Sequence, residues 1–598
     1  MPRSRDPIRG SEVVWHPEFT RRRRHLNLRD LGKSHLEWRA QSEADSGEEV
    51  DKLRDAQMDA DIVPLFMRDN DEISAEADKV GAFCPGTTLR RLMAEGAEGG
   101  PSSSPRALLH ERSIDGGVIG ERRNKGPMTA RQLYQALREP RCQSSQPQHS
   151  DVRHRHMFLN DLDPWAICAI FGTAPHYQRS AVASLVYRHL QARPCIRVKI
   201  HPQGQKFEFA FHLRYKVMRD SDTPNIDTRR FANGTALREY RNVSSLNLRG
   251  NQPQTHCYDA QISYLVAGRD ESTSDTICVK DAYFDSKPDG TSLTDMYDEI
   301  SQDADGTVAV DPSTCDEAEP DIPIPDPRQK FLRTLAYQLK GVTAESMRNV
   351  DRVYDSVRDY AQSEHDRQNP SEKCPSDPQI QAIDTIEWTA KVKELSQMLL
   401  MELTDLVHAI DEFLCKYQNL FQTQLCALSV SDINESLEEL EGLKKTLQNA
   451  IARCESLNET EQNRLKQFPC EMGRKTEFIS KSIYPVMIAT GIFSMQDHVL
   501  PFKANTTAFV CALLIITFLI HLGYDPSWWQ LVGSAADSVG LSQQIQAIYL
   551  RLPERVRTGS ASSTPHPPST DTPGSSAWTL PSWRRAGPQP TASVGMDV

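Results

Sequence analysis

The sequence predicts a cytosolic α/β domain followed by a long α-helical stalk and two C-terminal transmembrane helices. Three observations lead to this fold class. Apolar residues recur with a period of two between Met157 and Asp285, which is typical of strands. They then recur at helical spacing from Ile383 to Leu428. Finally, Thr506 to Tyr524 is apolar, carries no charge and is long enough to cross a bilayer.

Length and composition limit the classes of function. The chain has 598 residues, enough for about two or three domains, and its net charge of −12 argues against nucleic acid as a partner. Its 13 cysteines include no C-x-x-C pair, so we expect reduced thiols in a cytosolic compartment. No Walker loop, H-E-x-x-H or G-x-S-x-G motif is present, so we expect neither an enzyme nor a bound cofactor. The first residues lead into no apolar segment, so we expect membrane targeting to come from an internal one.

The first half of the chain divides into an arm and a domain. Residues 1–125 are polar and irregular, and we expect a disordered arm. The α/β domain is expected over residues 126–285, beginning with a short helix from Thr129 to Leu137 in which Thr129 is the N-cap. An amphipathic helix from His176 to Gln191 precedes four expected strands, at Cys195–Ile200, Phe207–Leu213, Tyr258–Val266 and Thr276–Phe284.

Three histidines come closest to a metal-binding cluster: His149, His154 and His156. Arg153 and Arg155 alternate with them. A basic stretch of this kind is more typical of a surface loop than of a ligand set, so we predict no metal site.

An acidic linker separates the α/β domain from the stalk. Residues 286–326 hold twelve acidic residues and one lysine, which favours a flexible segment. Residues 327–477 are predicted to form a helical or coiled-coil stalk, with helices at Pro327–Leu339, Ala344–Gln362 and Ile383–Leu428.

Another long helix is expected to complete the stalk. Asp432 and Glu435 make a start that is similar to a capping box. Further along, we expect Pro469 and Gly473 to bend or break this helix.

Residues 478–524 are predicted to form a two-helix transmembrane hairpin. The second span, Thr506 to Tyr524, rests on composition alone, and Trp528 and Trp529 follow it as an interfacial aromatic belt. The first span, Ile483 to Met495, is short, and by hydropathy alone it could be an interfacial helix. A helix that lines a pore need not be apolar on every face, however, and the polar candidates for its pore-lining face are Ser480, Thr490 and Ser494.

Positive charges predict the orientation of the hairpin. Basic residues lie before it, up to Lys481, and after it, from Arg551, whereas the short loop between the spans holds only Lys503. Both termini are therefore expected in the cytosol. Residues 525–598 would form a cytosolic tail, which we expect to be disordered from about Gly559 because it is rich in Ser, Thr and Pro.

Several short segments give the chain a family resemblance. They are Phe211–Tyr215, Tyr258–Ser263 with Gly268, Asp281–Asp285, Pro325–Arg328 with Phe331 and Leu332, and Phe493–Gln496 with Pro501 and Phe502. In this order, and with two closely spaced C-terminal spans, they resemble the CorA family of divalent-cation channels, and most closely a group of fungal CorA-like proteins. The resemblance covers about Thr129 to Tyr524.

The resemblance implies a homopentamer in a lipid bilayer, with the first span of each subunit lining a central pore. Mg²⁺ or another divalent cation would be the transported and regulatory ion. The family's Gly-Met-Asn signature corresponds here to Ser494, Met495 and Gln496, so only the methionine is kept. Gln496 retains a carboxamide that can hydrogen-bond to a hydrated ion, and Asp497 would add a ring of negative charge at the pore mouth.

Two hypotheses therefore stand. The first is passive flux of divalent cations through a homo-oligomeric CorA-like pore. The second is a non-conducting, membrane-anchored interaction or signalling scaffold with a degenerate CorA fold. The altered signature at Ser494 and Gln496 is the reason that both remain open.

Overall fold

The computed structural model describes residues 15–20, 33–44, 46–68, 75–94, 104–115, 118–122, 127–139, 141, 152–201, 206–248, 253–271, 273–285, 312–314, 324, 326–368, 378–494 and 506–524. By its contacts the chain divides into a first unit, residues 1–469, and a second unit, residues 470–598.

One β-sheet organises the first unit. Its strands lie in the order β2–β1–β3–β8–β7–β5–β4, with the short β6 paired to β7. Described neighbours run antiparallel except β3 and β8, which are parallel. The strands are β1 (Ala107–Asp115), β2 (Val118–Arg122), β3 (His154–Asn160), β4 (Cys195–His201), β5 (Lys206–Asp220), β6 (Tyr240–Asn242), β7 (Thr255–Asp270) and β8 (Thr273–Lys280).

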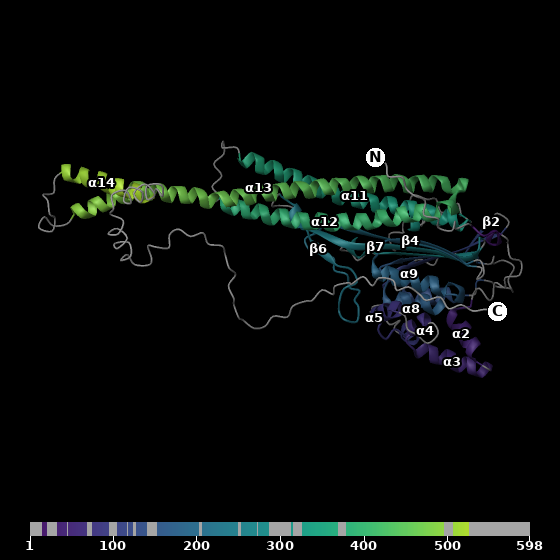
Figure 1. Ribbon diagram of the computed structural model, residues 1–598. Helices are drawn as coiled ribbons and strands as arrows, with labels where there is room; N and C mark the ends of the chain where they lie inside the picture. Colours follow the sequence, from purple (N-terminus) through teal and green to yellow (C-terminus); the bar gives the residue numbers. More distant parts are fainter. Residues whose placement is uncertain are drawn as a thin grey trace, which may run out of the picture. The chain divides into compact units, whose positions relative to one another are not determined.

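Helices cover both faces of this sheet, which makes three layers (Figure 1). Because neither face of the central strands meets water, β5 and β7 are buried along nearly their whole length. All four strands predicted from the sequence are present, but β5 and β7 extend well beyond the predicted bounds, and β8 ends at Lys280, before the predicted end at Phe284.

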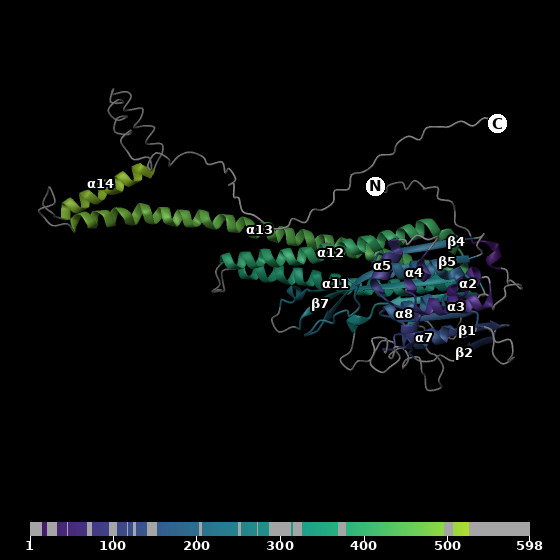
Figure 2. The same cartoon turned by 90° about the horizontal axis from the view of Figure 1, so that it is seen from below.

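Short helices form the layer on one face (Figure 2). The predicted helix at Thr129 is confirmed, because the side chains of Thr129 and Gln132 form a reciprocal capping box with each other's backbone amides. The predicted amphipathic helix is confirmed as α9, preceded by one 3₁₀ turn at His176–Gln178. The layer comprises α2 (His35–Glu43), α3 (Gly47–Asp59), α4 (Ile62–Met67), α5 (Ala75–Phe83), α6 (Leu89–Ala94), α7 (Ala130–Leu137), α8 (Pro164–Thr173) and α9 (Arg179–Gln191).

The prediction of a disordered arm over residues 1–125 is wrong for the described part of that range. Helices α2 to α6 and strands β1 and β2 lie there, and Phe66 and Phe83 are fully buried in the same hydrophobic cluster as α8 and α9. These helices are short, so packing against α8, α9 and one another stabilises them rather than intrinsic propensity.

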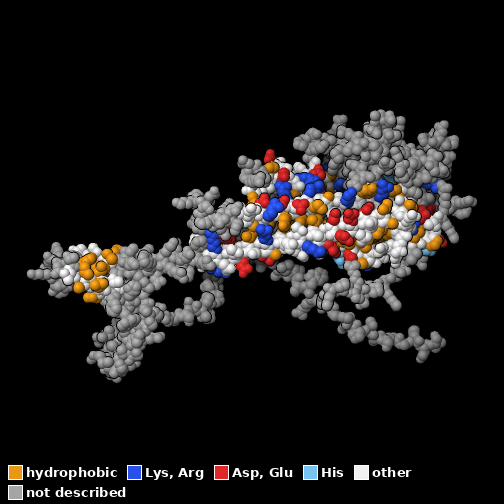
Figure 3. Space-filling view, turned by 90° about the horizontal axis from the view of Figure 1, so that it is seen from above, with side chains coloured by type: hydrophobic (Ala, Val, Ile, Leu, Met, Phe, Trp, Pro, Cys, Tyr) orange, Lys and Arg blue, Asp and Glu red, His pale blue; other side chains and the backbone are white. Residues whose placement is uncertain are grey.

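Three long helices form the layer on the other face. They are α11 (Pro327–Gln368), α12 (Pro378–Tyr417) and α13 (Ala427–Phe493). Phe331 of α11 lies at the centre of this layer, with its ring 5.6 Å from Phe209 of β5 and 6.0 Å from Phe421. Lys and Arg side chains are interspersed with Asp and Glu side chains on the face shown in Figure 3.

The bounds of these helices correct three predictions. Residues 327–368 form one helix, not two. The helix predicted to run to Leu428 ends at Tyr417, where two 3₁₀ turns reverse the chain. Leu420 and Phe421 mimic helical periodicity because their side chains point from these turns into the core. As a result α13 begins at Ala427, before the predicted capping box at Asp432.

The second unit contains the end of α13 and α14 (Thr506–Tyr524). Pro469 and Gly473 do not break α13, which is helical from Ala427 to Phe493, although the division of the chain into two units falls directly after Pro469. The predicted bounds of the last apolar helix are confirmed. Within the described ranges, no helix combines the length and the apolar character needed to span a bilayer.

Most of the acidic linker over residues 286–326 and the whole tail over residues 525–598 lie outside the described residues.

Candidate functional site

The structure places only part of the predicted pore. Thr490 and Ser494 lie one turn apart near the end of α13, and both are exposed. The Thr490 hydroxyl donates to the carbonyl oxygen of Val486 at 2.7 Å. Ser480 belongs to the same helix, but its side chain is outside the description. Met495, Gln496 and Asp497 lie outside the described residues, so the pore mouth remains a prediction.

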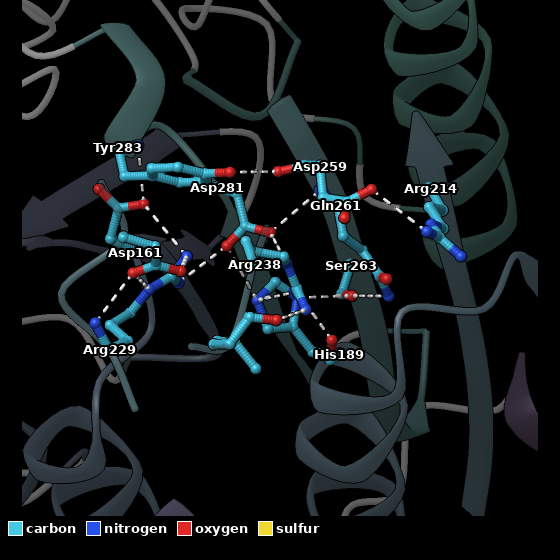
Figure 4. Close-up of polar contacts among 12 residues, drawn as sticks. Asp161, His189, Arg214, Arg229, Arg238, Asp259, Gln261, Ser263, Asp281 and Tyr283 are labelled. Carbon is cyan, nitrogen blue, oxygen red and sulfur yellow. Dashed lines mark hydrogen bonds and ion pairs between the residues drawn. The ribbon is translucent and has the colours of Figure 1, made fainter. Parts of the chain in front are cut away.

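By contrast, three motif segments from the sequence meet in one buried polar network (Figure 4). Asp281 and Tyr283 come from the segment after β8, Asp259, Gln261 and Ser263 come from β7, and Arg214 comes from β5.

Asp281 is the hub of the network and is fully buried. Its carboxylate accepts from Arg229 Nη1 at 2.8 Å, from Arg238 Nε at 2.6 Å and from the backbone amide of Gln261 at 3.0 Å. Burial alone would raise the pKa of Asp281, but the guanidinium groups of Arg238 and Arg229 outweigh it and hold the pKa well below its usual value. Asp281 is therefore ionised.

The two parallel strands explain why this hub lies where it does. Asp161 directly follows β3 and Asp281 directly follows β8, and the carboxyl ends of parallel strands lie at one edge of a sheet. Asp161 has a left-handed backbone (φ 50°), and its carboxylate accepts from the amides of Ala282 and Tyr283 at 2.8 and 3.0 Å. Here the Arg229 guanidinium lies between the two carboxylates, 2.8 Å from Asp281 and 3.8 Å from Asp161.

A neutral branch of the network leads to α9. His189 Nε2 lies 3.4 Å from Asp281, and His189 Nδ1 lies 3.0 Å from the Ser263 hydroxyl. The same hydroxyl lies 2.8 Å from His212 Nδ1. Burial lowers the pKa of both His189 and His212, so both imidazoles are neutral at physiological pH.

A charged branch leads from the hub toward β5. The Tyr283 hydroxyl donates to the Asp259 carbonyl oxygen at 2.9 Å. The Asp259 carboxylate in turn accepts from Lys216 and, at 3.2 Å, from Arg214 Nη2. Burial would raise the pKa of Asp259, but Lys216 and Arg214 hold it below its usual value.

These groups form a buried ion-pair network that stabilises the fold. Every charged member is buried or half-buried and paired with an opposite charge, which rigidifies the contact between strands, α9 and the segment that carries Arg229 and Arg238. Among the residues that the structure describes, no group of three or more His, Cys, Asp or Glu side chains is placed to hold a metal ion.

Sequence reasoning found the network only in part. The motif segments pointed to Asp281 and Asp259, but Asp161, His189, Arg229 and Arg238 stand in no recognisable motif. The histidines that we expected in a surface loop also differ: His154 and His156 lie on β3, and the His154 ring is buried with Nδ1 3.1 Å from the Ser274 hydroxyl. His149 lies outside the described residues.

Comparison with known proteins gives distant structural likenesses. No protein-family model matches the sequence, and no curated protein matches it. The full-length CmaX protein is 12% identical, with 70% of this chain and 98% of that chain covered and a TM-score of 0.37. The CorA magnesium transporter from Methanocaldococcus jannaschii is 12% identical, with 71% and 99% covered and a TM-score of 0.31.

A third structure, the ZntB cytoplasmic domain from Vibrio parahaemolyticus, is 8% identical, with 60% of this chain and 98% of that chain covered and a TM-score of 0.28. All three TM-scores lie below 0.5, so these likenesses are too distant to establish a family or an activity.

Proposed function

We propose that this chain is a CorA-like membrane protein that passes divalent cations passively through a homo-oligomeric pore. The observation that carries the proposal is the order of its parts. An α/β domain is covered by long helices, the last of these continues unbroken to Phe493, and an uncharged helix follows from Thr506 to Tyr524. This is the order that the motif resemblance implied.

The exposed apolar side chains in the second unit support a membrane location. Val486 and Met487 on α13 are 46% and 62% exposed, and Leu514 and Ile515 on α14 are 64% and 59% exposed. Side chains of this kind require lipid or neighbouring subunits to cover them. The 19 residues of α14 would extend roughly 28 Å at 1.5 Å per residue, close to the roughly 30 Å of a hydrocarbon core.

The continuity of α13 supports a pore-lining role for its end. At about 100° per residue, Ser480, Thr490 and Ser494 lie within an arc of about 80° on the helix. Ile483 and Met487 lie in the same arc, so the stripe contains both polar and apolar side chains. Such a stripe suits a helix that faces water on one side and neighbouring copies on the others.

The pore mouth in this proposal consists of Ser494, Met495, Gln496 and Asp497. The Gln496 carboxamides would hydrogen-bond to the water shell of the ion, because Mg²⁺ gives up its waters reluctantly. The Asp497 carboxylates would raise the local cation concentration. We further propose both termini in the cytosol, two spans per subunit and a pentamer.

Flux through the purified full-length chain in liposomes tests the proposal. We expect Mg²⁺ entry driven by an inside-negative potential, with slower entry in Gln496→Ala and Asp497→Ala. The Asp497→Ala defect should be larger at low ionic strength, where a ring of charge is least screened. Asn505→Ala changes a polar residue in the same short loop, next to α14, and is the matched control.

A well-folded oligomer that passes no divalent cation would overturn the channel proposal and leave the membrane-anchored scaffold. A monomeric or dimeric membrane form would overturn it as well, because one or two hairpins cannot enclose a pore.

A further inference from the structure

A buried carboxyl group lies between the long helix α12 and the sheet. Glu402 of α12 is 9% exposed, and both of its carboxyl oxygens are buried without a hydrogen-bond partner within the described structure. An unpaired buried carboxylate is costly, so this side chain requires an explanation.

The charges around Glu402 are unbalanced. Lys216 and Arg214 of β5 share a single carboxylate, that of Asp259 on β7. This trio carries a net charge of +1, so ionised Glu402 would neutralise the group and protonated Glu402 would not. The Nε–H of Arg214 is also buried and has no hydrogen-bond partner among the residues that the structure describes.

The other groups that face Glu402 carry no charge or lie in solvent. Helix α11 contributes Ser346 and Asn349 to the cavity beside it. On α12 itself, Asp405 is exposed. The Cys257 thiol of β7 is also near, and burial raises its pKa to about 12, so it stays protonated.

The cavity itself is small. Its volume is about 10 Å³, room for about one water molecule, and Leu399, Leu403 and Leu406 form its apolar wall. Asn349, which also lines the cavity, donates to the Lys216 carbonyl oxygen at 2.8 Å. A metal cation is disfavoured here, because Arg214 and Lys216 already line the cavity.

We propose that Glu402 is a proton-binding site that couples the packing of α12 on β5 to the surrounding pH. The protonated carboxyl fits the small, partly apolar cavity and leaves α12 firmly packed. Loss of the proton leaves a buried carboxylate that Lys216 and Arg214 stabilise only at a distance, since both are bonded to Asp259. Helix α12 then separates from β5 more readily.

The acidity of the group supports this assignment. Burial raises the pKa of Glu402 to about 7, with Lys216 and Arg214 acting against the rise. The proton therefore exchanges within the range of intracellular pH, where a fully solvated glutamate would be ionised throughout.

Hydrogen–deuterium exchange of the full-length protein at pH 6 and pH 8, corrected for the intrinsic effect of pH on exchange, tests the proposal. If the carboxyl returns to an ordinary pKa when α12 separates, local opening should be about tenfold more frequent at pH 8 than at pH 6. The effect should be confined to peptides from α12 and β5. Glu402→Gln should abolish it and show the pH 6 pattern at both pH values.

Matched variants make the result decisive. Glu387→Gln is the same substitution on the same helix at a fully exposed site, and it should keep the wild-type difference. Arg214→Gln removes a cation that favours ionised Glu402, so the midpoint of the change should move to higher pH. A wild type without a difference, or a difference that persists in Glu402→Gln, would overturn the proposal. The readout is independent of ion flux, so a failed channel assay does not affect it.

Discussion

Replacement of Asp281 by asparagine is the most informative test of the buried network. The substitution keeps the shape of the side chain but removes its charge, and it turns an amide N–H₂ toward groups that are already donors. Arg229 would keep the carboxylate of Asp227, which accepts from its Nε and Nη2 at 2.9 Å. Arg238 would keep only the carbonyl oxygens of Leu237 and His189 and the contact with the His189 ring among its described partners.

The expected loss of stability in Asp281→Asn follows from the fact that Arg238, unlike Arg229, would keep no carboxylate partner among those described. Loss of one partner of a buried ion pair costs about 3–5 kcal/mol, because the remaining charge stays buried. At about 2–4 °C per kcal/mol for a domain of a few hundred residues, Tm should fall by about 6–20 °C. Since Asp281 has a pKa well below its usual value in the folded protein, its stabilising contribution is present above the unfolded pKa and is lost only in acid. The deficit should thus be constant between pH 5 and pH 8.

Thermal unfolding followed by tryptophan fluorescence of the full-length protein is the assay. Asp285→Asn is the control, because Asp285 is 35% exposed and its partner Arg219 also pairs with Glu345. We expect a cost below about 1 kcal/mol there. Equal losses of stability in Asp281→Asn and Asp285→Asn would refute a stabilising role for the network. So would a double variant, Asp281→Leu with Arg238→Met, whose loss of stability equals or exceeds the sum of the losses in the two single variants.

Four further predictions concern packing and pH. In Gly268→Ala the new β-carbon would lie 2.6 Å from the Thr273 carbonyl oxygen, so a loss of about 1–3 kcal/mol is expected in the same thermal assay. Gly442→Ala, on α13 with nothing within 4 Å, should instead stabilise by about 0.5–1 kcal/mol. Phe331→Ala should cost about 3–5 kcal/mol, because the ring is fully buried. Glu402 has a pKa of about 7 in the folded protein, above its ordinary value of 4.5, so its stabilising contribution is present at low pH and is lost as the pH rises through 7. A pH series of unfolding curves should show this loss, of the order of 3 kcal/mol between pH 4.5 and pH 8, and Glu402→Gln should remove it.

The fold was predictable where local chemistry and burial agree. Thr129 caps its helix as expected, and α14 has its predicted bounds, because an N-cap and an uninterrupted apolar run are local signals. The turn after Tyr417 was missed because Leu420 and Phe421 keep the helical spacing of apolar residues outside a helix. Periodicity reports burial, and a tight turn against a core buries side chains just as a helix does.

The N-terminal helices were missed for the opposite reason. Apart from the apolar segment Ile62–Met67, the region resembles a disordered segment in composition, but Ser34 and Glu37 form a reciprocal capping box that is visible in the sequence. The capping box therefore indicated a helix more reliably than the composition of the region indicated disorder.

The candidate site was predictable only through its motif segments. Asp161 and Asp281 are far apart in the chain and meet because β3 and β8 pair in parallel, and no spacing in the sequence reveals a parallel pairing. Arg229 and Arg238 come from a connection between strands, so neither periodicity nor a motif marked them.

The sheet with both faces covered also shapes how this chain can vary. In a sheet with one wet face, every second strand position tolerates polar substitution, and a saturation mutagenesis map shows that alternation. Along β7 nearly all positions are buried, so its tolerance profile should be uniformly low. Sequence drift would then concentrate on the outer faces of the helices, and distant homologues should be easier to recognise by their central strands than by any other part of the chain.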